Sequence, residues 1–284
     1  MFIEASKVAE DEDPWGSEDD PQRPVERVQR VEWVAGAVQP ASDTLVREEP
    51  LEIRVNGVSV AVLMRTPGHD VDLVRGFLRT EGVVEDLASV RSIRHCDVVD
   101  DPESEGNVVR VGFDGHLDIE RFRRNMFASS SCGICGKASI TRALEVAKPF
   151  ERPASIDVER LLAVMPRMRD EQVVFGRTGG LHAAAAFDGD GRIVVLREDV
   201  GRHNAVDKVA GALSQTDQSP AGLAVSGRVS FEIVQKALAA RLPVVVAVSA
   251  PSSLAVRLAR QVNMTVVGFA RGQRAVVFSG EIVE

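Results

Sequence analysis

The sequence has few cysteines. Its 284 residues include only three, Cys96, Cys132 and Cys135, and this small odd number excludes a framework of structural disulfides. It also lacks an apolar run long enough to cross a bilayer, and residues 1–4 show neither the basic nor the apolar region of a secretory signal. We therefore expect a protein of the reducing cytoplasm with no membrane partner.

An excess of positive charge is also missing, since the formal net charge is −8. Residues 1–24 hold eight acidic residues against two basic ones, so this segment carries −6 of that total and the rest is nearly neutral. The balance argues against nucleic acid as a partner. Because the acidic segment has too little apolar surface to offset the entropy of ordering, we predict a disordered tail over residues 1–24. An acidic docking arm is the less favoured alternative.

The first ordered part of the chain has a mixed pattern. Residues 51–63 predict two strands around an Asn56-Gly57 type I′ turn. Residues 70–80 then place apolar side chains on one face of a helix, with Gly82 just beyond its end. We therefore assign residues 25–125 to a mixed α+β domain.

The second part, residues 126–284, has a different rhythm. An amphipathic helix is predicted over residues 137–147, and a hairpin over residues 183–196. After the hairpin, short β-branched runs alternate with polar loops and helices. Such continuous apolar strands indicate a buried, largely parallel sheet covered by helices, so the predicted fold class is α/β.

The two neighbouring cysteines are the first candidates for chemistry. Cys132-Gly133-Ile134-Cys135 lies immediately before the predicted helix and close to Lys137. The helix dipole and the lysine charge favour a thiolate there. The glycines at 133 and 136 keep the loop open. A thiolate on such a loop can attack a persulfide and carry its terminal sulfur onward.

Two other interpretations of the cysteine pair remain open. Half of a structural zinc site needs two further ligands, yet there is no second Cys-x-x-Cys, and the candidates Cys96, His95, His182 and His203 lack the usual spacing. A thioredoxin-type redox pair is the other alternative, because a Cys-x-x-Cys motif alone is only moderately specific.

Polar loops of similar chemistry recur in the second part of the chain, at residues 178–182, 199–204, 226–230 and 249–253. Backbone N–H groups at helix N-termini bind anions, arginine adds a bidentate phosphate contact, and ligands of open α/β sheets lie outside the carboxyl ends of the strands. The loops together therefore predict a large phosphorylated ligand. Its expected contacts are Thr178, Gly179, Gly180, His182, Gly201, Arg202, His203, Ser226, Arg228 and Ser230.

Simpler interpretations exist for these loops. Ordinary N-capping by Ser230, Ser252 and Asn204 explains any one of them. His182 and His203 are each either a buried histidine with satisfied hydrogen bonds or a proton shuttle. Neither a Walker A sequence nor G-x-G-x-x-G occurs, which argues against an ATPase and a Rossmann dehydrogenase.

Taken together, these motifs resemble the FdhD family, over about residues 49–274. The matching segments are Thr66-Pro67-Gly68, Gly76-Phe77-Leu78, Glu81-Gly82, Cys132-Gly133-Ile134-Cys135-Gly136, Thr178-Gly179-Gly180, His182-Ala183-Ala184-Ala185, Glu198-Asp199-Val200-Gly201-Arg202-His203, Asp207-Lys208 and Val248-Ser249-Ala250. The resemblance implies a second domain with a cytidine-deaminase-like, three-layer α/β fold. Deaminase activity itself is not expected, because the chain has no His-x-Glu.

The resemblance also implies a function, that of a sulfur carrier protein required for formate dehydrogenase activity. A persulfide is expected to pass from a cysteine desulfurase to the molybdenum cofactor, a bis-molybdopterin guanine dinucleotide of which GDP is a fragment. The resemblance assigns the persulfide to Cys132, and we assign its relay or resolution to Cys135. A cofactor-binding stretch is expected at Phe269, Ala270, Arg271, Gly272, Gln273 and Arg274. We further expect a homodimer.

Overall fold

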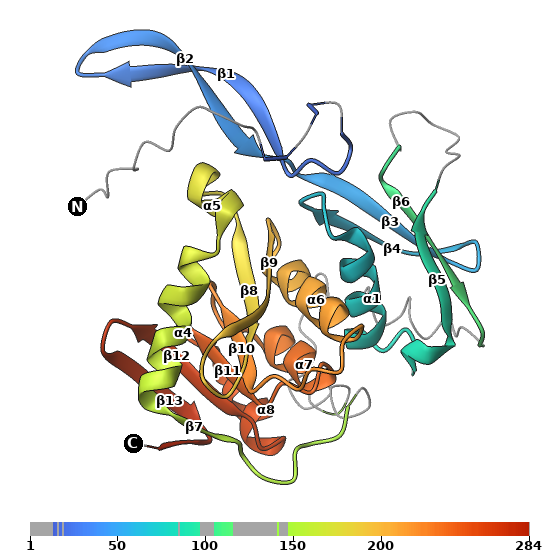
Figure 1. The fold of residues 1–284 in the computed structure, drawn as a ribbon, viewed down its shortest axis with the longest axis vertical. Helices are drawn as coiled ribbons and strands as arrows, with labels where there is room; N and C mark the ends of the chain where they lie inside the picture. Colours follow the sequence, from blue (N-terminus) through green and yellow to red (C-terminus); the bar gives the residue numbers. More distant parts are fainter. Residues whose placement is uncertain are drawn as a thin grey trace.

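A computed structural model describes residues 14–15, 17–18, 20–84, 86–96, 105–115, 141 and 147–283. The chain forms a two-stranded hairpin, a small sheet with one helix, and a larger sheet with helices on both faces (Figure 1). None of the helices in these ranges is long and apolar enough to cross a membrane. The predicted α/β class, with a mixed α+β part first, is confirmed.

The small sheet has four strands in the order β4-β3-β6-β5. Its elements are β3 (Glu49–Val55), β4 (Val58–Arg65), α1 (Asp70–Thr80), η1 (Leu87–Ser89), β5 (Val90–His95) and β6 (Val108–Phe113). Asn56 and Gly57 have φ angles of 49° and 85°, which confirms the predicted type I′ turn between β3 and β4. The buried face of α1, including Leu73 and Phe77, packs on Ile53 and neighbouring strand residues.

The large sheet has six strands in the order β13-β12-β11-β10-β8-β9. The strands are β8 (His182–Phe187), β9 (Ile193–Asp199), β10 (Gly222–Val225), β11 (Val244–Ala247), β12 (Thr265–Arg271) and β13 (Arg274–Ser279). Only β10, β11 and β12 are parallel neighbours. The prediction of largely parallel strands is wrong for the outer strands, because β8–β9 and β12–β13 are antiparallel hairpins.

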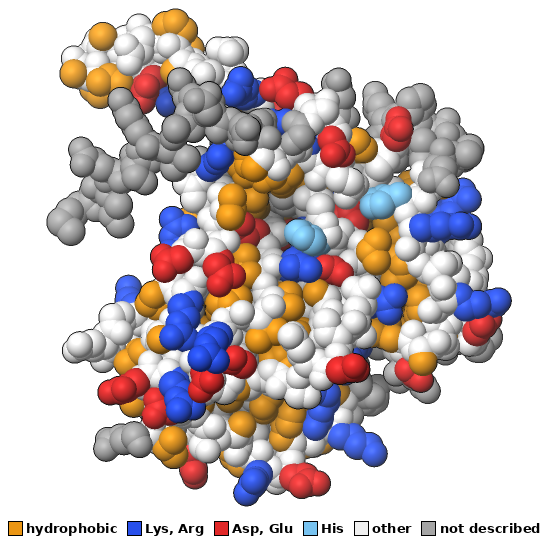
Figure 2. All heavy atoms as spheres, viewed as in Figure 1, with side chains coloured by type: hydrophobic (Ala, Val, Ile, Leu, Met, Phe, Trp, Pro, Cys, Tyr) orange, Lys and Arg blue, Asp and Glu red, His pale blue; other side chains and the backbone are white. Residues whose placement is uncertain are grey.

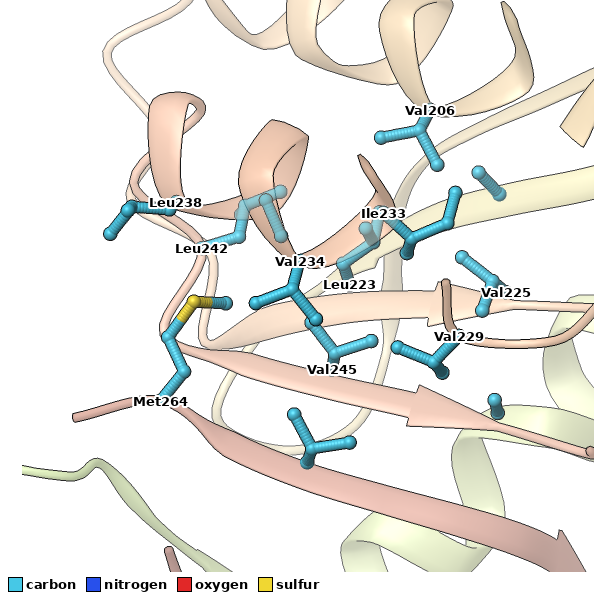
Figure 3. Close-up of a cluster of buried hydrophobic side chains, with 14 of the residues drawn as sticks. Val206, Leu223, Val225, Val229, Ile233, Val234, Leu238, Leu242, Val245 and Met264 are labelled. Atoms are coloured by element: carbon cyan, nitrogen blue, oxygen red, sulfur yellow. The ribbon is translucent and has the colours of Figure 1, made fainter. Parts of the chain in front are cut away.

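Helices cover both faces of the large sheet, which gives the expected three layers. On one face lie α6 (Arg202–Leu213), α7 (Phe231–Ala239) and α8 (Ser253–Gln261), and on the other lies α4 (Val158–Asp170). Figure 3 shows Ile233 and Val234 of α7 pointing toward Leu223 and Val245 of the sheet. Ala224, between Leu223 and Val225, packs in the opposite cluster with α4, as the two-residue period of a strand requires.

Helices α1 and α6 cross with almost no space between their backbones. A Cβ added to Gly76 of α1 would lie 1.8 Å from the carbonyl oxygen of Asp207. One added to Gly211 of α6 would lie 1.9 Å from the carbonyl oxygen of Asp72. Glycine at both positions therefore lets α1, in the first part of the chain, pack directly against α6.

Three short elements complete the described fold. Helix α5 (Val173–Thr178) precedes β8, and β7 (Ser155–Asp157) pairs in parallel with β14 (Glu281–Val283). Asp157 caps α4 by accepting a hydrogen bond from the backbone N–H of Arg160 at 3.0 Å. The pairing of β7 with β14 therefore joins the last strand of the chain to the start of α4.

The hairpin of β1 (Val25–Val34) and β2 (Ala37–Val46) projects from the rest of the molecule (Figure 1). Trp33 of β1 pairs with Val38 of β2, and these two residues are 70% and 69% exposed. Hydrophobic side chains therefore lie on the surface at the outer end of the hairpin (Figure 2). The sequence did not predict this hairpin. The preceding residues 20–24, assigned to the tail, are structured here, since Arg23 is buried and Arg47 binds the carbonyl of Asp20.

Candidate functional site

The predicted polar loops meet at one edge of the large sheet. Strands β9, β10 and β11 end there, at Asp199, Val225 and Ala247. Strand β8 begins at the same edge with His182, because it runs antiparallel to both of its neighbours. A Cβ added to Gly227 would lie 3.4 Å from Nδ1 of His182 and 3.8 Å from Cδ of Arg202, so three of the loops touch.

The fourth loop and the C-terminal stretch join the same edge. Val229 and Pro251 form an isolated parallel bridge, and the N–H of Ser252 donates to the carbonyl of Val229 at 2.9 Å. The N–H of Phe269 donates to the carbonyl of Ser249 at 3.2 Å. The edge is therefore one continuous surface from His182 to Phe269, as expected for a ligand site of an open α/β sheet.

Two of the helices that start at this edge have no side-chain cap on their first N–H groups. Gly201 precedes α6 and Ser230 precedes α7, and neither makes a side-chain cap hydrogen bond. By contrast, Oγ of Ser252 accepts from the N–H of Ala255, which confirms the predicted cap of α8. Uncapped N-terminal N–H groups carry the partial positive charge that attracts phosphate.

The predicted cap at Asn204 is wrong. Asn204 lies inside α6, and its side-chain amide donates to the carbonyl of Met64 at 2.7 Å and to Oδ1 of Asp199 at 3.0 Å. Ser230 does occupy the N-cap position, but its hydroxyl contacts Nε2 of His203 at 3.3 Å instead of the helix backbone. Glu232, in the first turn of α7, accepts a hydrogen bond from its own backbone N–H, so the start of α7 already holds a carboxylate, whereas α6 has no acidic residue in its first turn.

The histidines at this edge are held in their neutral form. Burial, followed by the positive charges of Arg202 and Lys236, lowers the pKa of His203 to about 4. Burial and Arg202 also lower the pKa of His182. The buried Nε of Arg202 has no hydrogen-bond partner among the described atoms. A donor without a partner, next to the uncapped start of α6, suits an anionic ligand.

The predicted residues before β8 are engaged within the protein. The hydroxyl of Thr178 donates to the carbonyl of Val174 at 2.8 Å, and Gly179 ends α5 with a φ of 67°. A Cβ on Gly180 would lie 3.1 Å from the side chain of Val46 in β2. Ser226 accepts a hydrogen bond from the N–H of Ala183 at 2.8 Å, which links the third loop to the start of β8. Arg228 is exposed.

The stretch from Phe269 to Arg274 contains the end of β12, the turn at Gly272 and Gln273, and the first residue of β13. Gly272 has a φ of 58°, and Gln273 and Arg271 are exposed beside it. The guanidinium of Arg274 lies 5.9 Å from the centroid of the Phe269 ring. Ala270 is the exception among the predicted contacts, because its side chain is only 1% exposed and packs in the core with α4.

Cys132 and Cys135 lie outside the described residues. Within the described ranges, no group of three or more His, Cys, Asp and Glu side chains is arranged to hold a metal ion. Cys96 is buried, in agreement with its interpretation as a small apolar residue.

Comparison with known proteins decides the family. Residues 46–282 match the FdhD/NarQ family. The chain belongs to this family. The sulfur carrier protein FdhD of Streptomyces avermitilis is 47% identical over 255 residues, covering 87% of this chain and 90% of that protein. The protein of the same name from Mycobacterium tuberculosis is 46% identical over 252 residues, covering 84% and 90%.

A solved structure shares the fold of this FdhD/NarQ family member. It is described as a formate dehydrogenase accessory protein of Desulfotalea psychrophila, and it superposes with a TM-score of 0.71 at 21% identity. The match covers 90% of this chain and 97% of the other. Both the predicted family and the predicted mixed α/β fold are therefore confirmed.

Sequence reasoning missed two buried polar clusters behind this edge. In one, Asp199 forms an ion pair with Lys208 at 2.8 Å and receives the N–H of Thr66. In the other, Lys236 lies 2.8 Å from Asp207. The available signal was the neighbouring Asp207 and Lys208 within the otherwise apolar run from Ala205 to Leu213 of α6. Charged residues are rarely fully buried without partners, so this pattern indicates paired charges.

Proposed function

We propose that this FdhD/NarQ family member is a sulfur carrier protein, a sulfurtransferase that serves formate dehydrogenase. It takes persulfide sulfur from a cysteine desulfurase and passes it to the molybdenum cofactor, a bis-molybdopterin guanine dinucleotide. Two findings support the general role: curated relatives are named sulfur carrier proteins, and the structural neighbour is described as a formate dehydrogenase accessory protein.

The observation that supports cofactor binding is the set of hydrogen-bond donors at the edge of the large sheet. The start of α6, which has no side-chain cap, and the buried, unpartnered Nε of Arg202 lie together there. These groups are hydrogen-bond donors, which suits the pyrophosphate of a guanine dinucleotide. Arg228, Arg271 and Arg274 add permanent positive charge on the surrounding loops. GDP, a fragment of the cofactor, is therefore the natural probe ligand.

The transfer chemistry belongs to Cys132. Its thiolate attacks the terminal sulfur of the desulfurase persulfide, a new S–S bond forms on Cys132, and the desulfurase thiolate leaves. This exchange needs no external oxidant or reductant. The persulfide stays on Cys132 until the cofactor is bound, and Cys135 then serves in its relay or resolution. In resolution its thiolate attacks Sγ of Cys132, a disulfide forms and hydrosulfide departs to the cofactor, and a cellular thiol reductant restores the two thiols. The two thiols supply the electrons that reduce the transferred sulfur.

Complementation tests the proposal in cells. In a strain that makes formate dehydrogenase but lacks its own family member, the unaltered chain should restore formate dehydrogenase activity and Cys132→Ala should not. Cys96→Ala, a change at the third cysteine, is the matched control and should restore activity. Equal restoration by the unaltered chain and Cys132→Ala contradicts the proposal. The homodimer and the cytoplasmic location stay predictions.

A further inference from the structure

The Thr66-Pro67-Gly68 turn between β4 and α1 is joined to the start of α6 by several hydrogen bonds. The N–H of Thr66 donates to Oδ2 of Asp199 at 3.2 Å, and its hydroxyl accepts from the N–H of Val200 at 3.1 Å. Its carbonyl accepts from Nζ of Lys208 at 2.8 Å. Thr66 is only 1% exposed, and its contacts with Asp199 and Lys208 are buried, while the contact with Val200 is partly buried.

Asp199 connects the Thr66-Pro67-Gly68 turn to Gly201, the residue that precedes α6. Its Oδ2 accepts from Thr66 and Lys208, while its Oδ1 accepts from the N–H of Gly201 at 2.8 Å and the amide of Asn204 at 3.0 Å. The contact from Oδ1 to Gly201, two residues on, is an Asx-type turn that fixes the backbone direction at the helix start. One fully buried carboxylate thus joins Thr66 to Gly201.

Space at this turn is limited, so a small shift matters. A Cβ on Gly201 would lie 2.9 Å from the side-chain nitrogen of Asn204. Helix α6 has no side-chain cap that would fix the direction of its first N–H groups. The position of Gly201 therefore decides whether these N–H groups point at a ligand.

We infer that Thr66 is a positioning residue for the phosphate-binding turn from Gly201 to His203, so the first part of the chain helps to shape the ligand site. Thr66 touches no ligand itself, since it is buried, and acts through Val200 and Asp199. This inference rests on the proposed function, which places the cofactor phosphates at that turn.

A second buried threonine provides a matched control. Thr80 also belongs to the first part of the chain, is 0% exposed, and contacts α6 through its hydroxyl, which donates to Oδ1 of Asp207 at 2.6 Å and accepts from Lys236 at 3.1 Å. Asp207 lies in the second turn of α6, beyond the predicted phosphate contacts. Loss of either hydroxyl should cost stability, but only Thr66 lies beside the ligand turn.

Calorimetric titration with GDP separates the two roles. Thr66→Val removes the hydroxyl and nearly keeps the shape, and it should weaken GDP binding about two- to tenfold, the effect of one lost hydrogen bond. Thr66→Ser keeps the hydroxyl and should bind as the unaltered chain does. Thr80→Val should lower the melting temperature and leave GDP affinity unchanged. All three variants should still accept sulfur on Cys132.

Each other outcome is informative. If Thr66→Val binds GDP as tightly as the unaltered chain, Thr66 is a structural residue only and the inference is overturned. It is also overturned if Thr80→Val weakens GDP binding as much as Thr66→Val does, because the effect is then general. Thr66→Ala removes the same hydroxyl without added bulk and replaces Thr66→Val if that variant does not fold. Absence of GDP binding by the unaltered chain contradicts the proposed nucleotide site itself, before any variant is compared.

Discussion

The ammonium group of Lys236 lies 2.8 Å from Oδ2 of Asp207, in the buried contact between α1, α6 and α7. Glu81 approaches the same ammonium at 2.6 Å. Burial raises the pKa of Asp207 to about 6, while Asp207 and Glu81 raise the pKa of Lys236 despite its burial. Both shifts leave the pair ionised at neutral pH. The docking of α1 on the α/β layers therefore depends on a buried ion pair.

Removal of one partner of this pair should be costly. Lys236→Met leaves Asp207 buried without a cation, so its carboxyl must either stay charged in an apolar site or take up a proton, and the free energy of unfolding should fall by about 3–5 kcal/mol. Lys236→Met combined with Asp207→Asn should lose less than the sum of the two single changes, because neither charge is then left alone. Denaturant unfolding followed by circular dichroism measures all three. Lys148→Met, at an exposed lysine, is the control, and an equal effect there contradicts the account.

His203 should make stability depend on pH in a defined window. Its pKa is about 4 in the folded chain against an ordinary value of 6.5, so the unfolded chain binds the extra proton between these values. His203 should therefore contribute a decrease in the free energy of unfolding as pH falls from 6.5 toward 4, while the raised pKa of Asp207 contributes in the opposite direction. His203→Gln should remove the His203 contribution, so its free energy of unfolding should fall less over this window than that of the unaltered chain. Urea unfolding at several pH values measures it, and an identical slope in the variant contradicts a depressed pKa at His203.

The exposed arginines at the sheet edge should contribute to nucleotide affinity. Arg228→Ala and Arg271→Ala should each weaken GDP binding about tenfold, the loss of a charged hydrogen bond at a partly screened site. Arg192→Ala, an exposed arginine on the β8–β9 turn, should bind GDP normally. Calorimetry on the three variants decides the matter. If Arg228→Ala and Arg271→Ala bind like the control, these two arginines do not contact the ligand.

Local signals in the sequence predicted a large part of this fold. Asn56-Gly57 identified its hairpin because that pair adopts positive φ at both positions. The polar loops identified one edge because parallel strands end together there. The hairpin from Val25 to Val46 escaped prediction, since valines at 25, 28, 31 and 34 recur every third residue, a period of neither a strand nor a helix.

The second layer of the site escaped prediction for a different reason. Thr66 and Asp199 are 133 residues apart, and nothing local in either segment encodes the other. The docking of α1 on α6 brings them together, and that depends on a close approach at Gly76 and Gly211. The sequence therefore shows that a buried charged residue needs a partner, but only the tertiary fold determines which residue that partner is.

Metal analysis separates sulfur carriage from its main alternative, a non-catalytic cofactor chaperone with structural zinc on the cysteine pair. The chaperone interpretation requires one tightly bound zinc per chain that is lost with either Cys132→Ala or Cys135→Ala. The carrier interpretation requires a chain without stoichiometric zinc whose Cys132 reacts with an alkylating reagent near neutral pH. Stoichiometric zinc on the purified chain contradicts the sulfur carrier account.

Intact-protein mass spectrometry tests the central claim most directly. The chain is incubated with a cysteine desulfurase and cysteine, and its mass is compared before and after treatment with a reductant. We predict one added, reducible sulfur atom on the unaltered chain, the same addition on Cys96→Ala, and none on Cys132→Ala. No added sulfur on the unaltered chain, or an unchanged adduct on Cys132→Ala, contradicts the assignment of Cys132 as the sulfur-carrying residue.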